Sequence, residues 1–174
     1  MFPDLEQIRS VCRVSEMEAR LLQGAAAPIV LLERLFTGGQ GALDIAEAVA
    51  PGNPSFGVML PYTPLHWLLL DRLQQPVVAT SGNRCDEPIC IDDREAVVRL
   101  RGIADLGRVH DRPIGGQVDG SGVQVVLERE MMLRRARGYA PLPHRLKEPI
   151  RPVLALGAHL KNTVALARNR EVFV

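Results

Sequence analysis

The chain has 174 residues, which suits one ordinary domain, or one domain and part of another. Its residues are 47% hydrophobic and 24% charged, as in packed soluble proteins, and the net charge of +1 argues against a broad nucleic-acid-binding face. No apolar run approaches the roughly 20 residues of a membrane-spanning helix, and the first residues do not resemble a signal peptide. Three cysteines without a CxxC pair indicate reduced thiols, so we expect a cytoplasmic protein without membrane contact.

The first part of the chain predicts two helices and a strand. Apolar residues near helical spacing predict a helix over residues 5–12, and Ser15 with Glu18 has the pattern of a capping box that begins a second helix. The run PIVLLER, residues 28–34, predicts a strand. The glycine-rich loop 38–41 lacks the Lys-Ser or Lys-Thr of a phosphate-binding loop, so we interpret it as a surface loop.

Helices and strands continue to alternate through the middle of the chain. Thr63 can cap a helix that has Pro64 at its first position, and Asp92 with Glu95 can open another. The predicted elements are a helix at 42–50, a strand at 56–60, a helix at 64–73, a strand at 76–80 and a helix at 93–100. This alternation favours an α/β fold with a mixed sheet and flanking helices.

The last part of the chain predicts two hairpins separated by a linker. Two runs of alternating hydrophobicity, 123–127 and 131–136, predict a hairpin joined at 128–130. The proline-rich stretch that follows has no periodicity and predicts a linker at 142–152. A second hairpin is predicted over 153–174, and because an isolated hairpin is marginal in water, we expect the chain to be part of a longer protein.

The loop Thr80-Ser81-Gly82-Asn83 is the first candidate binding element. It follows a predicted strand, and ligands of α/β proteins bind at the carboxyl ends of strands. Gly82 would let the backbone approach a phosphate, and the Ser81 and Asn83 side chains can donate hydrogen bonds to its oxygens. Four such residues on their own are more often only a turn.

A second candidate is the arginine-rich run LRRARGYAP, residues 133–141. Guanidinium groups match phosphate geometry, and Tyr139 could stack on a base. If the strand continued, Arg135 and Arg137 would share one face and Arg134 the other. An edge strand that carries charges as protection against pairing explains these residues equally well.

Other titratable residues give weaker signals. His110 with Asp111 could form an acid–base pair, but a salt bridge between Asp111 and Arg112 is the simpler interpretation. His66 lies among apolar residues and is interpreted as a partly buried histidine. The remaining histidines are scattered, so no zinc site is expected, and Cys85 is interpreted as a small residue rather than a reactive thiol.

Five stretches in this order resemble the HypF family of hydrogenase maturation carbamoyltransferases. The first four resemble its YrdC-like domain, and the fifth resembles the start of the TsaD-like domain that follows it. The stretches are VMLPYTPLHWLLL, VATSGNRCDEPI, GIAD with HDRPI, LRRARGYAP, and LALGAHLKNTVALA. The resemblance implies a YrdC-like domain at 1–141 that is incomplete at its N-terminus, with a twisted mixed sheet. It also implies a short hairpin stub of an actin-like (ASKHA) domain at 153–174.

The same resemblance implies a function. In the family, ATP and carbamoyl phosphate give a carbamoyl-adenylate, and the carbamoyl group passes to the C-terminal cysteine of a HypE partner during NiFe hydrogenase maturation. ATP and Mg²⁺ are the implied cofactors, with no metal site in this chain. By the resemblance, the nucleotide and phosphate site consists of Thr80, Ser81, Gly82, Asn83, Arg135, Arg137 and Tyr139, and the substrate loop contributes His110, Arg112, Asp119 and Ser121.

This chain departs from the family pattern at three positions of the site. Cys85 replaces a serine after the TSGN loop, Gln117 replaces an arginine, and Gly120 replaces an aspartate. With the Lys-Pro element of the family also missing, we expect the chain not to complete the reaction alone. An exposed sheet edge would favour self-association. The alternatives are a threonylcarbamoyl-adenylate synthase acting in tRNA modification and a non-catalytic remnant that binds nucleotide or double-stranded RNA.

Overall fold

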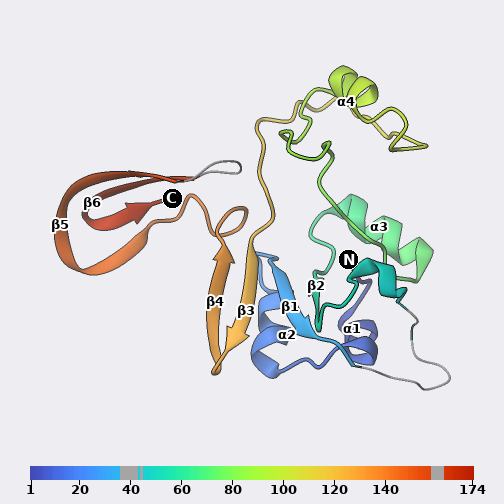
Figure 1. Cartoon of the computed structure of the whole chain (residues 1–174), viewed down its shortest axis with the longest axis horizontal. Coiled ribbons are helices and arrows are strands. Elements are labelled where there is room, and N and C mark those ends of the chain that lie inside the picture. The colour runs from blue at the N-terminus through green and yellow to red at the C-terminus, as the bar shows by residue number, and fades with distance from the viewer. Residues whose placement is uncertain (36–42, 44, 158–162) are drawn as a thin grey trace. The chain divides into compact units, whose positions relative to one another are not determined.

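The computed structural model describes residues 1–35, 43, 45–157 and 163–174, and its chain divides into two units. The first unit comprises residues 1–79 and 120–142, and the second comprises residues 80–119 and 143–174. Figure 1 shows the elements of both units. The glycine-rich loop 38–41 lies outside the described residues.

Two capped helices begin the first unit, as the sequence predicts. Helix α1, Leu5–Val11, has Asp4 as its N-cap, and the Asp4 carboxylate accepts a hydrogen bond from the Gln7 amide at 2.8 Å. Helix α2, Glu16–Gln23, begins with a complete capping box. In that box the Ser15 amide donates to the Glu18 carboxylate at 2.8 Å. Both caps satisfy amide groups that have no partner within their own helix.

A mixed sheet of four strands forms the centre of the first unit (Figure 1). Its strands are β1 (Ile29–Glu33), β2 (Ser55–Val58), β3 (Gly122–Val126) and β4 (Arg129–Arg134), in the order β2-β1-β3-β4. Strand β1 pairs antiparallel with β2 and parallel with β3, and β3 pairs antiparallel with β4. The expected α/β fold with a mixed sheet is therefore confirmed.

The core lies where β1 meets its two neighbours. Val30 is the register partner of both Val58 and Val123, and all three side chains are fully buried. Ile8 of α1 and Leu22 of α2 pack in the same cluster. Each fully buried side chain of this kind contributes roughly 1.5–3 kcal/mol relative to an exposed one. The helices and the sheet are thus held together by one apolar layer.

Two further helices begin at the predicted caps. Helix α3, Pro64–Leu73, follows Thr63, whose hydroxyl accepts from the His66 amide at 3.2 Å. Helix α4, Asp93–Arg99, belongs to the second unit and follows Asp92, whose carboxylate accepts from the Glu95 amide at 2.8 Å. No helix within the described residues is long and apolar enough to cross a membrane.

Residues 76–80 do not form the predicted strand. Val77 instead forms two backbone hydrogen bonds with Met1. The Val77 amide donates to the Met1 carbonyl at 2.9 Å, and the Met1 amino group donates to the Val77 carbonyl at 2.8 Å. The Val78 side chain is 76% exposed. An apolar run of β-branched residues reports a tendency to be buried, but a strand also needs a neighbour with which to pair.

Residues 42–50 form only one short turn of 3-10 helix, η1 (Glu47–Val49), within the described part of this stretch. The Arg34 guanidinium binds the Glu47 carboxylate at 2.7 Å and donates to the Ala50 and Asn53 carbonyls. These bonds close the segment into a loop. The Ala50 and Asn53 carbonyls thus accept hydrogen bonds from an arginine side chain instead of from the backbone amides of a continuing helix.

The predicted hairpin of the first unit is present, with a tighter turn than expected. Leu127 and Glu128 connect β3 to β4, and both have positive φ angles, 50° and 58°. A two-residue turn with both φ angles positive matches the twist of paired strands.

The C-terminal hairpin consists of β5 (His144–Leu156) and β6 (Val164–Phe173), which pair antiparallel. The stretch 142–152, predicted to be a linker, lies largely within β5. The register of the pair shifts on either side of Ile150, close to Pro149 and Pro152, because proline cannot donate to a strand ladder. The domain limits given above remain predictions.

Candidate functional site

The TSGN loop opens the second unit and has one unsatisfied polar atom. Thr80 and Gly82 are exposed, whereas Ser81 and Asn83 are half-buried. The Asn83 side-chain amide donates to the Arg84 carbonyl at 2.7 Å, and its Oδ1 is buried without a hydrogen-bond partner among the described residues. A buried acceptor without a partner is costly, and a ligand that donates a hydrogen bond would remove that cost.

A cavity of about 460 Å³ lies beside this loop within the second unit. Gly82 and Cys90 contribute to one part of its lining, and His110 contributes from the predicted substrate loop. Asp92 at the start of α4 and Arg108 add charged groups of both signs. The volume is within the range of small-molecule sites, and the cavity brings two of the predicted site residues together.

The loop is tied to α4 by an ion-pair network around Arg99. The Arg99 guanidinium binds the Glu87 carboxylate at 2.7 Å and the Glu95 carboxylate at 2.8 Å, and it donates to the Pro88 carbonyl. These hydrogen bonds, first that of Glu87, raise the pKa of Arg99. Arg84 in turn donates to the Arg99 carbonyl at 2.6 Å. The sequence motifs discussed above do not predict this network, although Glu95 and Arg99 have the i, i+4 spacing of a helical ion pair.

The predicted substrate loop has its own internal contacts. His110 Nδ1 accepts from the Arg112 amide at 3.2 Å, and both residues are exposed. The Gln117 side-chain amide donates to the Ile89 carbonyl at 2.9 Å. This bond links the substrate loop to the segment that follows the TSGN loop. Asp119 is half-buried at the end of the second unit.

The arginine-rich run lies in the first unit, and β4 ends at Arg134 before most of it. Each arginine binds backbone carbonyls: Arg134 binds Gly120, Arg135 binds Tyr139 and Leu142, and Arg137 binds Ala27. Arg135 and Arg137 therefore do not share the face of a strand. Their guanidinium groups hold this segment against nearby backbone. Because a guanidinium has five donors, Arg137 can in addition donate to an anion.

The segment around Gly138 is held tightly. The Ser121 side chain is completely buried, donates to the Arg137 carbonyl at 2.9 Å and accepts from the Ala136 amide at 2.8 Å. The Tyr139 hydroxyl donates to the Glu130 carboxylate at 2.5 Å. Burial, together with this carboxylate, raises the pKa of Tyr139. Two predicted site residues, Ser121 and Tyr139, thus have internal partners.

Tyr62 is a neighbour of Arg137 that the sequence analysis missed. The Arg137 guanidinium carbon lies 3.7 Å from the centroid of the Tyr62 ring, and His66 meets that ring edge-on with centroids 4.6 Å apart. Burial and the positive charge of Arg137 lower the pKa of His66. Tyr62 precedes the N-cap Thr63 of α3, and no local sequence pattern indicates its contact with Arg137.

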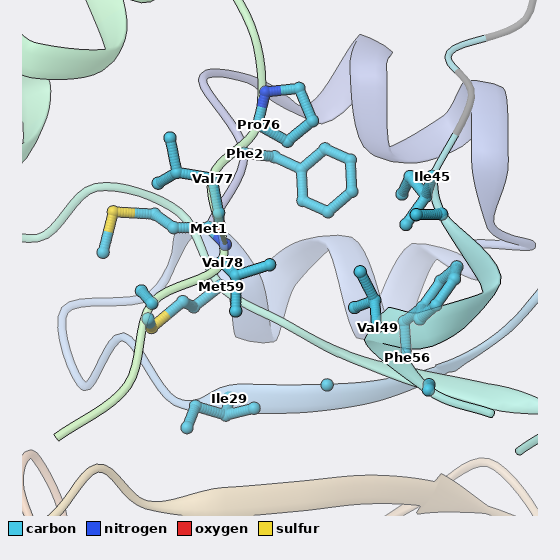
Figure 2. A pocket seen from close by; sticks show the side chains of 14 residues that line it. Met1, Phe2, Ile29, Ile45, Val49, Phe56, Met59, Pro76, Val77 and Val78 are labelled. Carbon is cyan, nitrogen blue, oxygen red and sulfur yellow. Dashed lines mark hydrogen bonds between the residues drawn. The ribbon is translucent and has the colours of Figure 1, made fainter. Parts of the chain in front are cut away.

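A second cavity, of about 390 Å³, lies in the first unit and is apolar (Figure 2). Phe2, Phe56 and Met59 are among its lining side chains, and the segment that leads to the TSGN loop forms one wall through Val77 and Val78. Among the described residues of the lining, no side chain is charged, although Met1 also carries the N-terminal amino group. This cavity therefore offers mainly apolar burial.

The structure does not place the two halves of the predicted site against one another. Thr80, Gly82 and His110 belong to the second unit, whereas Arg135 and Arg137 belong to the first. The joint site therefore remains a prediction. Within the described residues, no group of three or more His, Cys, Asp or Glu side chains is arranged to hold a metal ion.

Known proteins similar to this chain agree with the fold. A family model for Sua5, YciO and YrdC proteins, described as Telomere recombination, matches residues 1–136. The carbamoyltransferase HypF of Synechocystis sp. is 51% identical over 175 residues, which cover 100% of this chain and 22% of that protein. HypF of Rhizobium leguminosarum bv. viciae is 40% identical over 181 residues, which cover 100% of this chain and 23% of that protein.

Two solved structures are also similar. Full-length HypF in the phosphate- and nucleotide-bound form gives a TM-score of 0.83 at 40% identity, covering 99% of this chain and 26% of that one. HypF from T. kodakarensis gives 0.86 at 33% identity, covering 98% of this chain and 22% of that one. The chain thus spans roughly a quarter of these proteins. It belongs to the Sua5/YciO/YrdC family and corresponds to one segment of the HypF carbamoyltransferases.

Proposed function

We propose that this chain supplies the nucleotide-handling part of a HypF-type carbamoyltransferase. It binds ATP, and it forms or holds the carbamoyl-adenylate made with carbamoyl phosphate, whose carbamoyl group passes to the C-terminal cysteine of a HypE-like acceptor in NiFe hydrogenase maturation. The identity of 51% to a carbamoyltransferase HypF supports the assignment. So does the similarity to a solved structure of full-length HypF in the phosphate- and nucleotide-bound form.

The chemistry of the step defines what the site must offer. Water first hydrolyses carbamoyl phosphate, so that inorganic phosphate leaves and carbamate remains. A carbamate oxygen then attacks the α-phosphorus of ATP, the bond from that phosphorus to the oxygen that bridges it to the β-phosphorus breaks, and pyrophosphate leaves. Negative charge is spread over phosphoryl oxygens in the transition state, and positioned donors stabilise it. Mg²⁺ bound with ATP would neutralise part of that charge. In this chain the donors would be the Thr80 and Ser81 hydroxyls, the exposed Gly82 backbone and the free guanidinium edge of Arg137.

The observation that carries the proposal is the unsatisfied Oδ1 of Asn83. This atom accepts hydrogen bonds only, so its partner must be a donor. The substrates provide three kinds of donor, which are the carbamoyl NH₂ group, the ribose hydroxyls and the amino group of adenine. Asn83 would therefore orient one of these parts of the ligand, while neighbouring groups contact phosphate.

Titration calorimetry with ATP tests this assignment. Gln117 in place of an arginine removes one charge-assisted hydrogen bond, which is worth roughly 1.5–3 kcal/mol, or about 10- to 150-fold in affinity. We therefore expect binding in the high micromolar range or weaker, and a further loss of roughly tenfold in Asn83→Ala. Asn53→Ala, an exposed asparagine in the first unit, is the matched control. Tight binding that survives in an Asn83→Ala, Arg137→Ala double variant would place the nucleotide elsewhere.

Exchange of labelled pyrophosphate into ATP tests the reaction. Under the proposal the exchange depends on carbamoyl phosphate and is slow. Exchange that needs threonine and bicarbonate instead would favour the threonylcarbamoyl-adenylate reaction. Binding of double-stranded RNA and self-association remain predictions, to be tested by gel shift and sedimentation on the same preparation.

A further inference from the structure

Arg137 and Tyr62 form the closer of two cation–π pairs among the described residues. The guanidinium carbon lies 3.7 Å from the Tyr62 ring centroid, compared with 4.5 Å for Arg34 over Phe56. A guanidinium whose carbon lies at that distance over the ring face is attracted to the ring, which limits the orientations that its N–H groups can take. The ring therefore restricts a side chain that would otherwise have several rotamers.

Hydrogen bonds also hold the backbone carbonyl and one guanidinium nitrogen of Arg137. Ser121 binds the Arg137 carbonyl, and one guanidinium nitrogen, Nη2, donates to the Ala27 carbonyl at 2.9 Å. Among the described residues, Nε and Nη1 of Arg137 have no hydrogen-bond partner. The side chain is half-buried and all of these contacts lie within the first unit. Such a group is held in one orientation while two of its nitrogens remain able to donate.

We propose that Tyr62 is a positioning residue: its ring, braced edge-on by His66, holds the Arg137 guanidinium with its unpaired N–H groups directed at the phosphate oxygens of the bound nucleotide. This inference rests on the proposed function, and it adds Tyr62 and His66 to the residues on which nucleotide affinity depends. Preorganised donors lose less rotamer entropy on binding, so the gain appears as affinity rather than as a new contact.

Affinity for ATP in a set of Tyr62 and Arg137 variants tests the proposal. Tyr62→Phe keeps the stack and should stay within about twofold of the wild-type Kd, whereas Tyr62→Leu should raise Kd roughly two- to thirtyfold. Arg137→Lys should not restore full affinity, because an ammonium cannot stack in a defined plane. Phe56→Leu removes an arginine–aromatic stack elsewhere in the same unit and should leave Kd unchanged once the folded fraction is matched.

The pKa of His66, measured by NMR titration without any ligand, shows whether the Arg137 guanidinium lies near the Tyr62 ring. Arg137→Ala removes a nearby positive charge and should raise the pKa of His66 in the wild-type background. If Tyr62 holds Arg137 in place, the same substitution made in Tyr62→Leu should have little further effect. An equal rise in both backgrounds would mean that Arg137 stays in place without the ring, and the proposal would be wrong.

The two measurements separate this inference from the proposed function. Loss of ATP binding in Asn83→Ala together with unchanged binding in Tyr62→Leu would overturn the positioning role alone. A wild-type chain that binds no ATP would overturn both. Additive effects of Tyr62→Leu and Arg137→Ala on Kd would also contradict the proposal, because residues that act through one another are not additive.

Discussion

Ser121 and Arg137, 16 residues apart in the chain, are joined by a hydrogen bond of 2.9 Å from the Ser121 hydroxyl to the Arg137 carbonyl. The same hydroxyl accepts from the Ala136 amide at 2.8 Å, so one buried oxygen satisfies two backbone groups. This pair of bonds connects the start of β3 to the arginine-rich run and sets the backbone from which Arg137 reaches Tyr62.

Replacing Ser121 with alanine should therefore destabilise the first unit. The substitution leaves a backbone amide and a carbonyl unsatisfied in a buried place, and each such group costs roughly 1–3 kcal/mol. We expect a loss of this order in urea-induced unfolding, with an unchanged dependence of the unfolding free energy on urea. Ser10→Ala is the control, because Ser10 is exposed and bonds only within α1. A loss below about 0.5 kcal/mol for Ser121→Ala would show that water replaces the hydroxyl.

Gly138→Ala should have a larger effect. Gly138 has a φ of +88°, and a Cβ at this position would lie 2.3 Å from the Ala26 carbonyl oxygen, which is backbone and cannot move aside alone. Backbone strain of this kind costs about 1–3 kcal/mol before the clash is counted. We expect a chain that is poorly folded at 37 °C by circular dichroism.

Gly52→Ala distinguishes the cost of a positive φ angle from the cost of a steric clash. Gly52 also has a positive φ, +65°, but the space around it is open. Its substitution should cost only about 1–2 kcal/mol, the usual penalty of a left-handed residue. Equal losses for Gly52→Ala and Gly138→Ala would mean that the close approach to Ala26 does not contribute.

Gly82→Ala should leave stability nearly unchanged and weaken nucleotide binding. An added Cβ would meet only the Leu100 side chain, at an ordinary contact distance of 3.8 Å, and no positive φ is present. The methyl group would, however, occupy the space that a phosphate needs to approach the backbone. We expect an unfolding midpoint close to that of the wild type and a clear rise in Kd for ATP. Unchanged affinity would show that phosphate does not approach at Gly82.

Alkaline pH should destabilise the chain through Cys12. Burial raises the pKa of this thiol from 9.0 to about 11, and its side chain is only 1% exposed. A raised pKa means that the folded state keeps a proton that the unfolded state loses, so the stabilisation is complete below pH 9 and is lost as the pH rises towards 11. The expected loss is on the order of 1–3 kcal/mol.

Chemical denaturation between pH 7 and pH 11 measures this effect. Cys12→Ala serves as the comparison, because tyrosine and lysine ionise in the same range and must be subtracted. The difference between the two curves should grow above pH 9. Parallel curves would show that the thiol ionises as easily in the folded state as in the unfolded state.

The sequence by itself determined the elements whose signals are local. The capping box at Ser15, the cap at Thr63 followed by Pro64, and the cap at Asp92 each begin a helix at the predicted residue. Hydrogen bonds over three residues need no distant partner, so the pattern is sufficient. The α/β character and the YrdC-like resemblance were readable for the same reason, since each motif is a short, continuous stretch.

Tertiary structure decided whatever depends on a partner far along the chain. Residues 76–80 have the composition of a strand but pair only at Val77, and β4 ends at Arg134 although the apparent alternation continues. The contact of Arg137 with Tyr62 joins residues 75 positions apart. A sequence pattern records which side chains prefer burial or pairing, whereas the identity of the partner is set by how the whole chain packs. For that reason the stack on Tyr62 became visible only in the folded structure.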